Sequence, residues 1–435
     1  MKNKTCTFKL EHVHPDTIDK IITNLKNSKS SGLDYIDTYI IKLAKDEILP
    51  ALTHIANLSI EQCLFPDNFK ASKVIPLHKK EDCLNPKNYR PVSILPILSK
   101  IMERVIYIQM ISYLEENKLL NASHHGFRSH FSTTSALLQM YDDWIETLEN
   151  NEYSGVCLID MSAAFDMVNH DLLLKKLELY GFEKNSLEGI ASYLSNRKQC
   201  VSIDGILSTF LNVSIGVPQG SILGPIFYII YTNDLPEIVH EHLNENPDVS
   251  TENFYCDECG GICCFADDST YSCSGKTQEI LNEKLAVNYK KIANYMDSNR
   301  LKLNGEKTHL MTMMTSQARR FKPELKVSLT IGNDIIETSK SEKMLGGIIH
   351  ENLKWTEFIQ NSKESLIRTL NKRLKGIYKI CRVSDFKTRK MIAGGIFNTK
   401  LIYLMPLWGG CELYLIRSLQ IIQNKVARAV TKQGW

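Results

Sequence analysis

Two adjacent carboxylates, Asp267 and Asp268, mark the point of the sequence with the clearest chemical meaning. An apolar run over 261–265 precedes them, and polar and aromatic residues alternate over 269–273. This pattern predicts a β-hairpin with both acids at its turn. Adjacent carboxylates repel each other unless a cation lies near them, and Mg²⁺ binds protein carboxylates together with substrate phosphates. The pair therefore indicates a site for a divalent metal.

A third acid, Asp160, follows a buried strand predicted over Gly155–Ile159. A single Asp after a strand is more often the cap of a turn or helix than a metal ligand. Together with the hairpin acids, however, it supplies what two-metal phosphoryl transfer requires. In that reaction two ions about 4 Å apart activate the attacking 3′-oxygen and stabilise the leaving pyrophosphate. The three carboxylates therefore predict a polymerase, provided that the fold brings them together.

The glycine-rich segment Gly216–Pro225 is a second candidate. Its three glycines allow close approach of the backbone, and Pro225 suits the first turn of a helix. Helix N-termini favour anions, which suits a nucleotide or template phosphate beside the loop. A plain loop before a buried helix is the alternative. The segment 274–277 ends like a P-loop, but position 270 is Thr rather than the required Gly, which excludes Walker-type binding.

Composition and length point to a folded protein with two or three subdomains. The chain has 435 residues, of which 43% are hydrophobic and 23% charged. Its apolar runs stop well short of the ~18 residues that a membrane span needs, and no secretory signal is recognisable. The twelve cysteines are scattered, often inside apolar runs, which is typical of reduced intracellular thiols. We therefore expect a nuclear or cytoplasmic protein without a disulfide framework.

Charge is distributed unevenly along the chain. Residues 354–435 contain 16 Lys and Arg against 4 Asp and Glu, a net charge of +12, whereas the whole chain carries only +3. A basic end on an acidic body indicates a polyanion such as nucleic acid as the partner of that end. The alternative is a solvated helical face that is rich in lysine.

The periodicity of apolar residues predicts helices and antiparallel strands without regular βαβ repetition, which is typical of the α+β class. Helices are predicted over 15–65, 97–119, 133–148, 170–180 and 279–299, and over most of 355–435. Strands are predicted over 73–80, 155–159, 200–203, 211–215, 261–273 and 310–314.

Taken in order, the motifs resemble the reverse transcriptase domain of non-LTR (LINE-like) retrotransposons, most of all the jockey-type group. The resemblance runs from Phe8 to the segment 423–428. Each block is weak alone, but the ordered set is specific. The blocks are Ser31–Asp34, Asn88–Ser93, His125–Arg128, Leu158–Asp166, Gly216–Gly220, Phe265–Asp268, Leu303–Thr308 and Leu345–Gly347.

The resemblance implies a right-hand polymerase: an N-terminal extension and fingers in 1–150, a ferredoxin-like antiparallel palm in 151–354 and a basic helical thumb in 355–435. The reverse transcriptase domain itself would cover roughly 58–350. The implied activity is that of an RNA-directed DNA polymerase, a nucleotidyltransferase that extends a primer with deoxynucleotides. Its cofactors would be two Mg²⁺ ions, with Mn²⁺ as a substitute. Its partners would be an RNA template, a DNA primer and deoxynucleoside triphosphates, with the RNA–DNA hybrid held by the basic C-terminal region.

The resemblance also implies roles for the acids and their neighbours. Asp160 and Asp267 would bind both metal ions, with the backbone carbonyl of Met161 as a further ligand. Asp268 belongs to the same acidic cluster. Lys307 is the candidate proton donor to the leaving pyrophosphate.

Five further residues are candidates for contact with the substrate. Phe165 matches the aromatic steric gate that excludes a 2′-hydroxyl, with a packed core aromatic as the alternative. Gln219 matches the residue beside the incoming nucleotide and the template. Arg90 and one of Lys79 or Lys80 would reach the triphosphate, for which a guanidinium offers bidentate contact.

The segment 240–261 departs from the family pattern because it is longer than usual and holds six acids but no Lys or Arg. It contains Cys256 and Cys259 at a spacing that suits zinc, with His240 and His242 nearby. A structural zinc site requires four ligands, and only the two cysteines have a suitable spacing. An acidic surface loop is therefore the default expectation.

No endonuclease motif precedes Phe8, and no RNase H acid set follows the basic region, so we expect the polymerase portion alone, as a fragment or a degraded copy. Two rival functions share these features: an RNA-templated RNA polymerase and a catalytically silent nucleic-acid-binding relic. The aromatic Phe165 argues against the first, and the intact carboxylates argue against the second.

Overall fold

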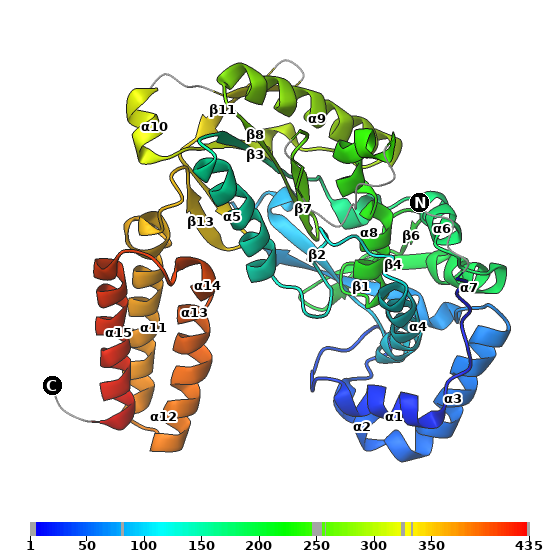
Figure 1. The fold of residues 1–435 in the computed structure, drawn as a ribbon. Helices are drawn as coiled ribbons and strands as arrows, with labels where there is room; N and C mark the ends of the chain where they lie inside the picture. Colours follow the sequence, from blue (N-terminus) through cyan, green and yellow to red (C-terminus); the bar gives the residue numbers. More distant parts are fainter. Residues whose placement is uncertain are drawn as a thin grey trace. The chain divides into compact units, whose positions relative to one another are not determined.

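The computed structural model describes residues 6–79, 82–245, 255–256, 258–322, 327–331 and 334–432. The chain divides into two compact units (Figure 1). Unit 1 combines Met1–Phe127, Met161–Leu235 and Ala293–Leu303, and unit 2 combines Arg128–Asp160, Pro236–Ile292 and Asn304–Trp435. Each unit is therefore assembled from separated stretches of chain. The division into three consecutive subdomains at 150 and 354 stays a prediction.

A six-stranded sheet forms the centre of unit 2, in the order β10-β11-β9-β3-β8-β7. The strands β9, β3, β8 and β7 pair antiparallel, as the sequence predicts. In contrast, β11 joins β9 in parallel, which corrects the expectation of a wholly antiparallel palm sheet. The connection between them passes through α10 and β10 and is long enough for a parallel crossover. The strands of unit 2 are β3 (Tyr153–Ile159), β7 (Gly261–Phe265), β8 (Asp268–Gly275), β9 (His309–Met313), β10 (Ser328–Ile331), β11 (Asp334–Ser339), β12 (Ser341–Met344) and β13 (Gly347–His350).

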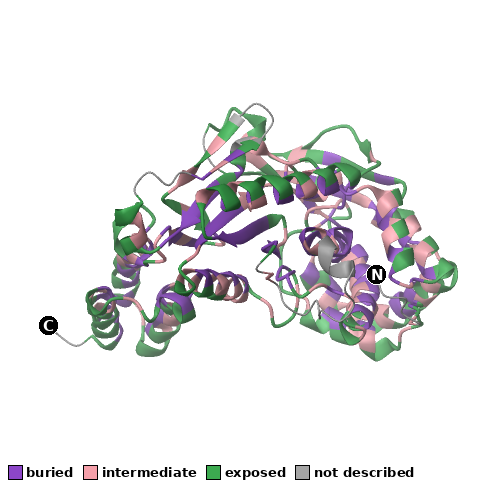
Figure 2. Ribbon diagram, turned by 45° about the horizontal axis from the view of Figure 1, so that its top comes forward, coloured by how far each residue is buried: buried purple, intermediate pink, exposed green. Residues whose placement is uncertain are grey.

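Helices cover both faces of this sheet, which explains why β3 is buried along almost its whole length. On one face, Val156 belongs to the same core as Trp144 of α5. On the other face, a Cβ at Gly155 would lie 3.0 Å from Leu285 of α9, so the helix approaches this strand closely. Figure 2 shows the strands as largely buried. For the same reason the structure buries both Cys263 and Cys264.

The C-terminal helices of unit 2 continue this core. Along α11, Leu366, Leu370 and Leu374 are buried at helical spacing, whereas Arg368 and Lys372 are exposed. Their apolar residues form one cluster with those of α5 and the sheet. The helices of unit 2 are α5 (Thr133–Glu149), most of α9 (Gln278–Ser298), α10 (Ser316–Phe321), α11 (Leu366–Cys381), α12 (Phe386–Ala393), α13 (Thr399–Leu401), α14 (Met405–Trp408) and α15 (Leu413–Thr431).

Unit 1 contains a five-stranded mixed sheet and a set of helices. The path β2-β1-β4-β5 is joined by β6, which pairs with β4, and only the β1–β4 pair is parallel. The pairing of β4 with β6 confirms the two strands predicted near 200 and 211. Its elements are α1 (Pro15–Asn24), α2 (Thr38–Leu43), α3 (Lys45–Glu61), β1 (Ala71–His78), β2 (Tyr89–Ile94), α4 (Ile97–Glu116), α6 (His170–Leu179), α7 (Lys184–Leu194), β4 (Arg197–Ile203), β5 (Ile206–Leu207), β6 (Leu211–Val213) and α8 (Leu223–Thr232).

Helix α8 is the most buried element of unit 1, with nine of its ten residues buried, because it is apolar on every side. It packs against α4 and α6. Within the described part of the chain, each helix is too short or too polar to span a membrane.

Candidate active site

The three candidate carboxylates of unit 2 lie at one edge of the six-stranded sheet. Asp160 directly follows β3, whose last register pair with β8 is Ile159↔Ser269. One further step along this register places Asp160 opposite Asp268, the first residue of β8. Asp267 lies in the turn of the hairpin, because Phe265 pairs with Asp268. The hairpin predicted from the sequence is thus present with both acids at its turn, and the antiparallel register brings the distant Asp160 beside them.

The carboxylates are accessible at this edge. Asp267 and Asp268 are exposed, and the side chain of Asp160 retains 36% of its exposure. Among the described residues, the three acids do not form a group whose ligand atoms all lie within 4.8 Å of one another. Exposed side chains can rotate toward a shared ion, and the hard oxygen donors suit Mg²⁺. The residues present at this edge therefore fit a divalent cation.

A turn after α9 holds Asp160 from the other side. The backbone N–H of Asn304 donates to the carbonyl of Asp160 at 3.0 Å, and the Asn304 amide nitrogen lies 3.4 Å from Asp160 Oδ2. The short helix Gly305–Lys307 then brings Lys307 Nζ to 3.7 Å from the same oxygen. The lysine predicted as proton donor thus lies at the carboxylate edge, at the C-terminal end of β3.

In unit 1 the glycine-rich loop is clamped between two backbone segments. Gly216 has φ +81°, and its amide donates to the carbonyl of Val168. A Cβ at Gly216 would lie 2.7 Å from the backbone of Asp166, and one at Gly220 would lie 2.5 Å from the carbonyl of Ser93 in β2. Both positions need glycine because the neighbouring backbones come so close. The loop that presents Gln219 is therefore fixed on two sides.

The side chain of Gln219 is held by Asp166, to which the sequence analysis assigned no role. The helix that follows, α6, is capped by Asn169. The amide of Gln219 donates to both oxygens of Asp166, at 3.0 and 3.1 Å. Burial raises the pKa of Asp166 above its usual value, although the bond from Gln219 opposes the shift. The acid orients the predicted nucleotide-contacting amide.

Phe165 is partly exposed and is held by two other aromatic side chains of unit 1. Its ring stacks on Tyr228 at 4.9 Å and meets Phe127 edge-on at 6.2 Å. The hydroxyl of Tyr228 in turn donates to the sulfur of Met161 at 3.2 Å. The ring is thus neither a fully buried core residue nor a free one, which is compatible with a rigid wall beside a sugar.

Glu103 in α4 is the positioning residue that sequence reasoning missed. Its carboxylate is fully buried and accepts from the amides of Ile222 and Leu223 at 2.6 and 3.3 Å, where α8 begins. Burial raises the pKa of Glu103, and the positive charge of buried Arg197 opposes this. The carboxylate caps α8 and thereby anchors the C-terminal end of the Gln219 loop. Its signal in the sequence is an acid directly after the apolar pair Ile101 and Met102.

The predicted triphosphate-contacting residues lie on one hairpin of unit 1. Arg90 stands on β2 opposite Leu77 of β1, and Lys79 follows β1, its amide bonded to the carbonyl of Asn88. Both side chains are exposed. Lys80 lies outside the described residues.

Unit 2 also contains a basic hollow between β12–β13 and the C-terminal helices. Burial, and next the charges of Arg373 and Lys343, lower the pKa of Lys400, which indicates crowded cations. Glu364 bonds Lys343 at the rim. The charged residues that line the hollow are Lys343, Lys363, Glu364, Arg368, Lys372, Arg373 and Lys400.

Comparison with known protein families shows to which family the chain belongs. Residues 77–349 match the family described as "Reverse transcriptase (RNA-dependent DNA polymerase)". The chain belongs to the reverse transcriptase family. The resemblance predicted from the motifs is thereby confirmed, and so is the enzyme class of its relatives.

Curated relatives place this reverse transcriptase among retrotransposon proteins. It is 27% identical to the RNA-directed DNA polymerase from mobile element jockey of Drosophila melanogaster, over 98% of this chain and 44% of that protein. It is 25% identical to the probable RNA-directed DNA polymerase from transposon X-element of the same species, over 97% of this chain and 44% of that protein. The chain thus spans less than half the length of these curated relatives.

Within the reverse transcriptase match lie all the candidate acids and substrate-contacting residues, from Lys79 to Lys307. The basic hollow extends past its end at residue 349, into α11 and the helices that follow. The roles of the individual residues in metal and substrate binding stay predictions.

Proposed function

We propose that this chain is the polymerase portion of a non-LTR retrotransposon protein and that it extends a primer 3′-hydroxyl with deoxynucleotides on an RNA template. The observation that carries the proposal is the antiparallel register of β3 and β8, which sets Asp160 beside the Asp267–Asp268 turn. In this proposal the sheet of unit 2 belongs to the palm, the β1–β2 hairpin to the fingers and the C-terminal helices to the thumb.

Asp160 and Asp267 hold two Mg²⁺ ions, with the carbonyl of Met161 as a further ligand, and Mn²⁺ is a substitute of similar coordination. When bound, the ions activate the attacking oxygen and stabilise the leaving pyrophosphate. Asp268 orients its neighbour. Lys307, held 3.7 Å from Asp160, donates a proton from Nζ to the pyrophosphate.

The residues of unit 1 bind and select the nucleotide. Arg90 and one of Lys79 or Lys80 contact the triphosphate. Arg90 and Lys79 support this because both are exposed cations on one hairpin. Gln219, oriented by Asp166, contacts the nucleotide and the template. The ring of Phe165 excludes the 2′-hydroxyl and so selects deoxynucleotides.

The basic hollow of unit 2 supports a nucleic-acid partner. Six Lys and Arg side chains line it together with one acid, Glu364, and crowded cations of this kind are relieved by a phosphate backbone. We infer that the RNA–DNA hybrid binds here through its backbone, with an affinity that falls steeply as salt rises.

Primer extension tests the proposal most directly. Asp160→Ala is expected to lower incorporation by at least roughly 1000-fold in Mg²⁺, because loss of a metal ligand removes several kcal/mol of transition-state stabilisation. Template binding and the thermal midpoint are expected to stay near those of the wild type. Asp142→Ala, an exposed acid on α5, is the matched control.

Undiminished extension by Asp160→Ala would refute the assignment of the metal ligands. A wild-type chain that binds the hybrid but never extends it would favour the rival function, a catalytically silent nucleic-acid-binding relic.

A further inference from the structure

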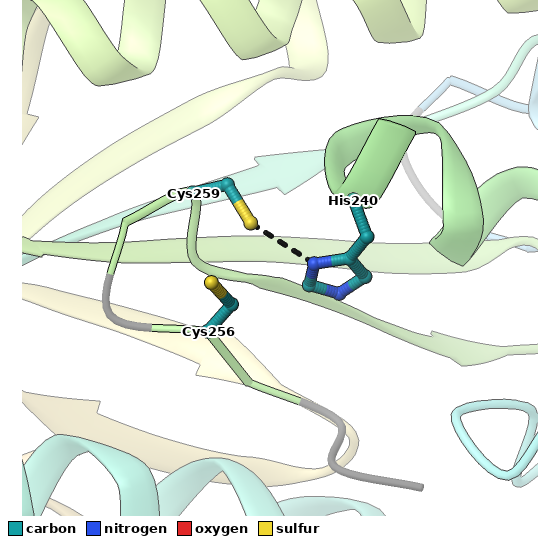
Figure 3. A group of neighbouring side chains, drawn as sticks. All are labelled: His240, Cys256 and Cys259. Atoms are coloured by element: carbon teal, nitrogen blue, oxygen red, sulfur yellow. Dashed lines mark hydrogen bonds between the residues drawn. The ribbon is translucent and has the colours of Figure 1, made fainter. Parts of the chain in front are cut away.

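A histidine and two cysteines of unit 2 converge outside the carboxylate edge. Figure 3 shows His240, on the short helix Leu235–Glu245, pointing toward Cys256 and Cys259 in the turn before β7. One ligand atom from each lies within 4.8 Å of the other two, and among the described residues this is the one group of three or more His, Cys, Asp or Glu with that property. Sequence spacing supplied the cysteine pair, and the fold adds the imidazole.

The contact between His240 and Cys259 is unusually close. Nδ1 lies 2.9 Å from Sγ, whereas the sulfur hydrogen bonds of Cys63, Cys200 and Cys264 are 3.6 to 3.9 Å long. With Zn–N near 2.0 Å and Zn–S near 2.3 Å, two ligand atoms of a tetrahedral zinc ion lie roughly 3.5 Å apart. The three side chains therefore need only small rotations to share one ion.

The backbone of the turn is built to hold the two cysteines in place. The amide of Gly260 donates to the carbonyl of Cys256 at 2.7 Å, and the reverse bond measures 3.2 Å. Gly260 has φ +79°, and a Cβ there would lie 2.0 Å from the carbonyl of Ser272 in β8. Glycine is thus required directly after the second cysteine, because the turn presses against the neighbouring strand.

Side chains of β8 and α9 fix the second cysteine further. The hydroxyl of Tyr271 donates to the carbonyl of Cys259 at 2.7 Å, and the amide of Asn288 donates to it at 3.3 Å. The same amide also bonds the Tyr271 hydroxyl at 2.8 Å. A preorganised turn of this kind lowers the cost of ordering the ligands when an ion binds.

Burial and charge favour a soft divalent ion over a hard one. Cys259 is buried, and His240 and Cys256 are half-buried. Two thiolates and a neutral imidazole around a divalent cation carry no net charge, so the complex suits a buried position better than isolated thiolates would. Sulfur and imidazole donors select zinc rather than Mg²⁺.

We propose that His240, Cys256 and Cys259 bind a zinc ion that fastens the Leu235–Glu245 helix to the start of β7. This site is separate from the proposed function, because Cys259 and the Asp267 turn lie at opposite ends of β7, roughly 20 Å apart along the strand. Three protein ligands leave one tetrahedral position for a water molecule. His242, which the sequence places nearby, has its side chain outside the described residues.

The test is the zinc content of the whole chain purified under reducing conditions and measured by elemental mass spectrometry. We expect one zinc ion per chain, and Co²⁺ in its place is expected to give thiolate charge-transfer and tetrahedral ligand-field absorption. Cys256→Ser, Cys259→Ser and His240→Ala are each expected to lose the ion. The exposed Cys83→Ser and His12→Ala variants, which change the same residue types elsewhere, are expected to keep it.

A readout on the wild type keeps the proposal testable if a ligand variant does not fold. Chelation is expected to lower the thermal midpoint of the wild type, and added Zn²⁺ to restore it, because an ion that binds only the folded state stabilises it. The proposal is overturned if the reduced wild type neither contains nor takes up zinc, or if all three ligand variants retain it. Loss of zinc with retained primer extension would leave the polymerase proposal intact.

Discussion

The carboxylate edge of unit 2 and the Gln219 loop of unit 1 hold their residues in different ways. Asp160 and Asp267 lie at the ends of paired strands, and the backbone hydrogen bonds between these strands do not involve the carboxylates. Gln219 stands on a loop that relies on two close-packed glycines and on the buried carboxylate of Glu103. We therefore expect that substitution of Asp160 or Asp267 changes activity but not the stability of the fold. Substitution of Glu103, which anchors the Gln219 loop, is expected to lower the stability as well.

The largest effect is expected at the hairpin acids, which belong to the residues held at strand ends. Asp267→Asn is expected to lower nucleotide incorporation at least roughly 1000-fold, because it removes charge from a proposed metal ligand. Asp268→Asn, which acts through its neighbour, is expected to lower it only roughly 10- to 100-fold. Single-nucleotide incorporation measures both, and the thermal midpoints are expected to stay unchanged. Equal losses in the two variants would contradict this division of roles.

Glu103→Ala tests whether the buried carboxylate anchors the Gln219 loop. Truncation leaves Arg197 buried without its counter-charge and removes the cap of α8, so the free energy of unfolding is expected to fall by about 3–5 kcal/mol. Urea unfolding measures it. Glu103→Gln is the matched control, because its carbonyl still accepts from Ile222, and a smaller loss is expected. A fully stable Ala variant would mean that the carboxylate does not anchor the loop.

Phe165→Val sharpens the comparison by separating selectivity from stability in unit 1. The smaller side chain is expected to reduce discrimination against ribonucleotides by roughly 10- to 100-fold, because valine no longer fills the space that the 2′-hydroxyl would occupy. The ratio of kcat/KM for matched deoxy- and ribonucleotides measures it. Phe210→Val, an exposed aromatic of the same unit, serves as the control. Unchanged sugar selectivity would remove the gate role.

The smallest effect is expected at Asp143 on α5, a partly buried acid whose Oδ2 has no hydrogen-bond partner within the described chain. Burial, and next the charges of Glu146 and Asp142, raise its pKa to about 7. The folded state therefore holds this proton more tightly than the unfolded state, whose pKa is about 4. Stability is fully present below that lower value and falls as pH rises to about 7.

Asp143→Asn is expected to remove this contribution. The thermal midpoint of the wild type should drop more between about pH 5 and about pH 8 than that of the variant, because other titrating groups cancel in the difference. Parallel pH profiles for the two proteins would show that the carboxyl is already solvated. In contrast to the carboxylate of Glu103, which accepts from two amides, Oδ2 of Asp143 has no hydrogen-bond partner among the described residues, so a small stabilisation by the variant above pH 7 is also expected.

Local sequence patterns predicted the elements that carry the acids. The alternation around Phe265–Asp268 gave the hairpin, and the apolar run before Asp160 gave β3, within two residues of its bounds. The long helix predicted from residue 97 ends at Glu116 rather than 119. Such features follow from side-chain periodicity along a few neighbouring residues, which a sequence displays directly.

Long-range pairings were not predictable in the same way. Asp166 and Gln219 are 53 residues apart, and His240 and Cys259 are 19 apart across an acidic segment. Glu103 is one of several charged residues in the sequence of α4, and only the fold shows that α8 begins at its carboxylate. No local periodicity encodes such contacts, because they depend on how separate elements pack.

The sequence alone determined which groups this protein has for chemistry: three carboxylates at strand ends, a glycine loop and a basic C-terminal region. Residue type and local spacing suffice for that, because they set propensity and charge. Only the tertiary structure decided which groups meet. The register of the strands placed Asp160 beside the hairpin, and the packing of the Leu235–Glu245 helix placed His240 near the two cysteines.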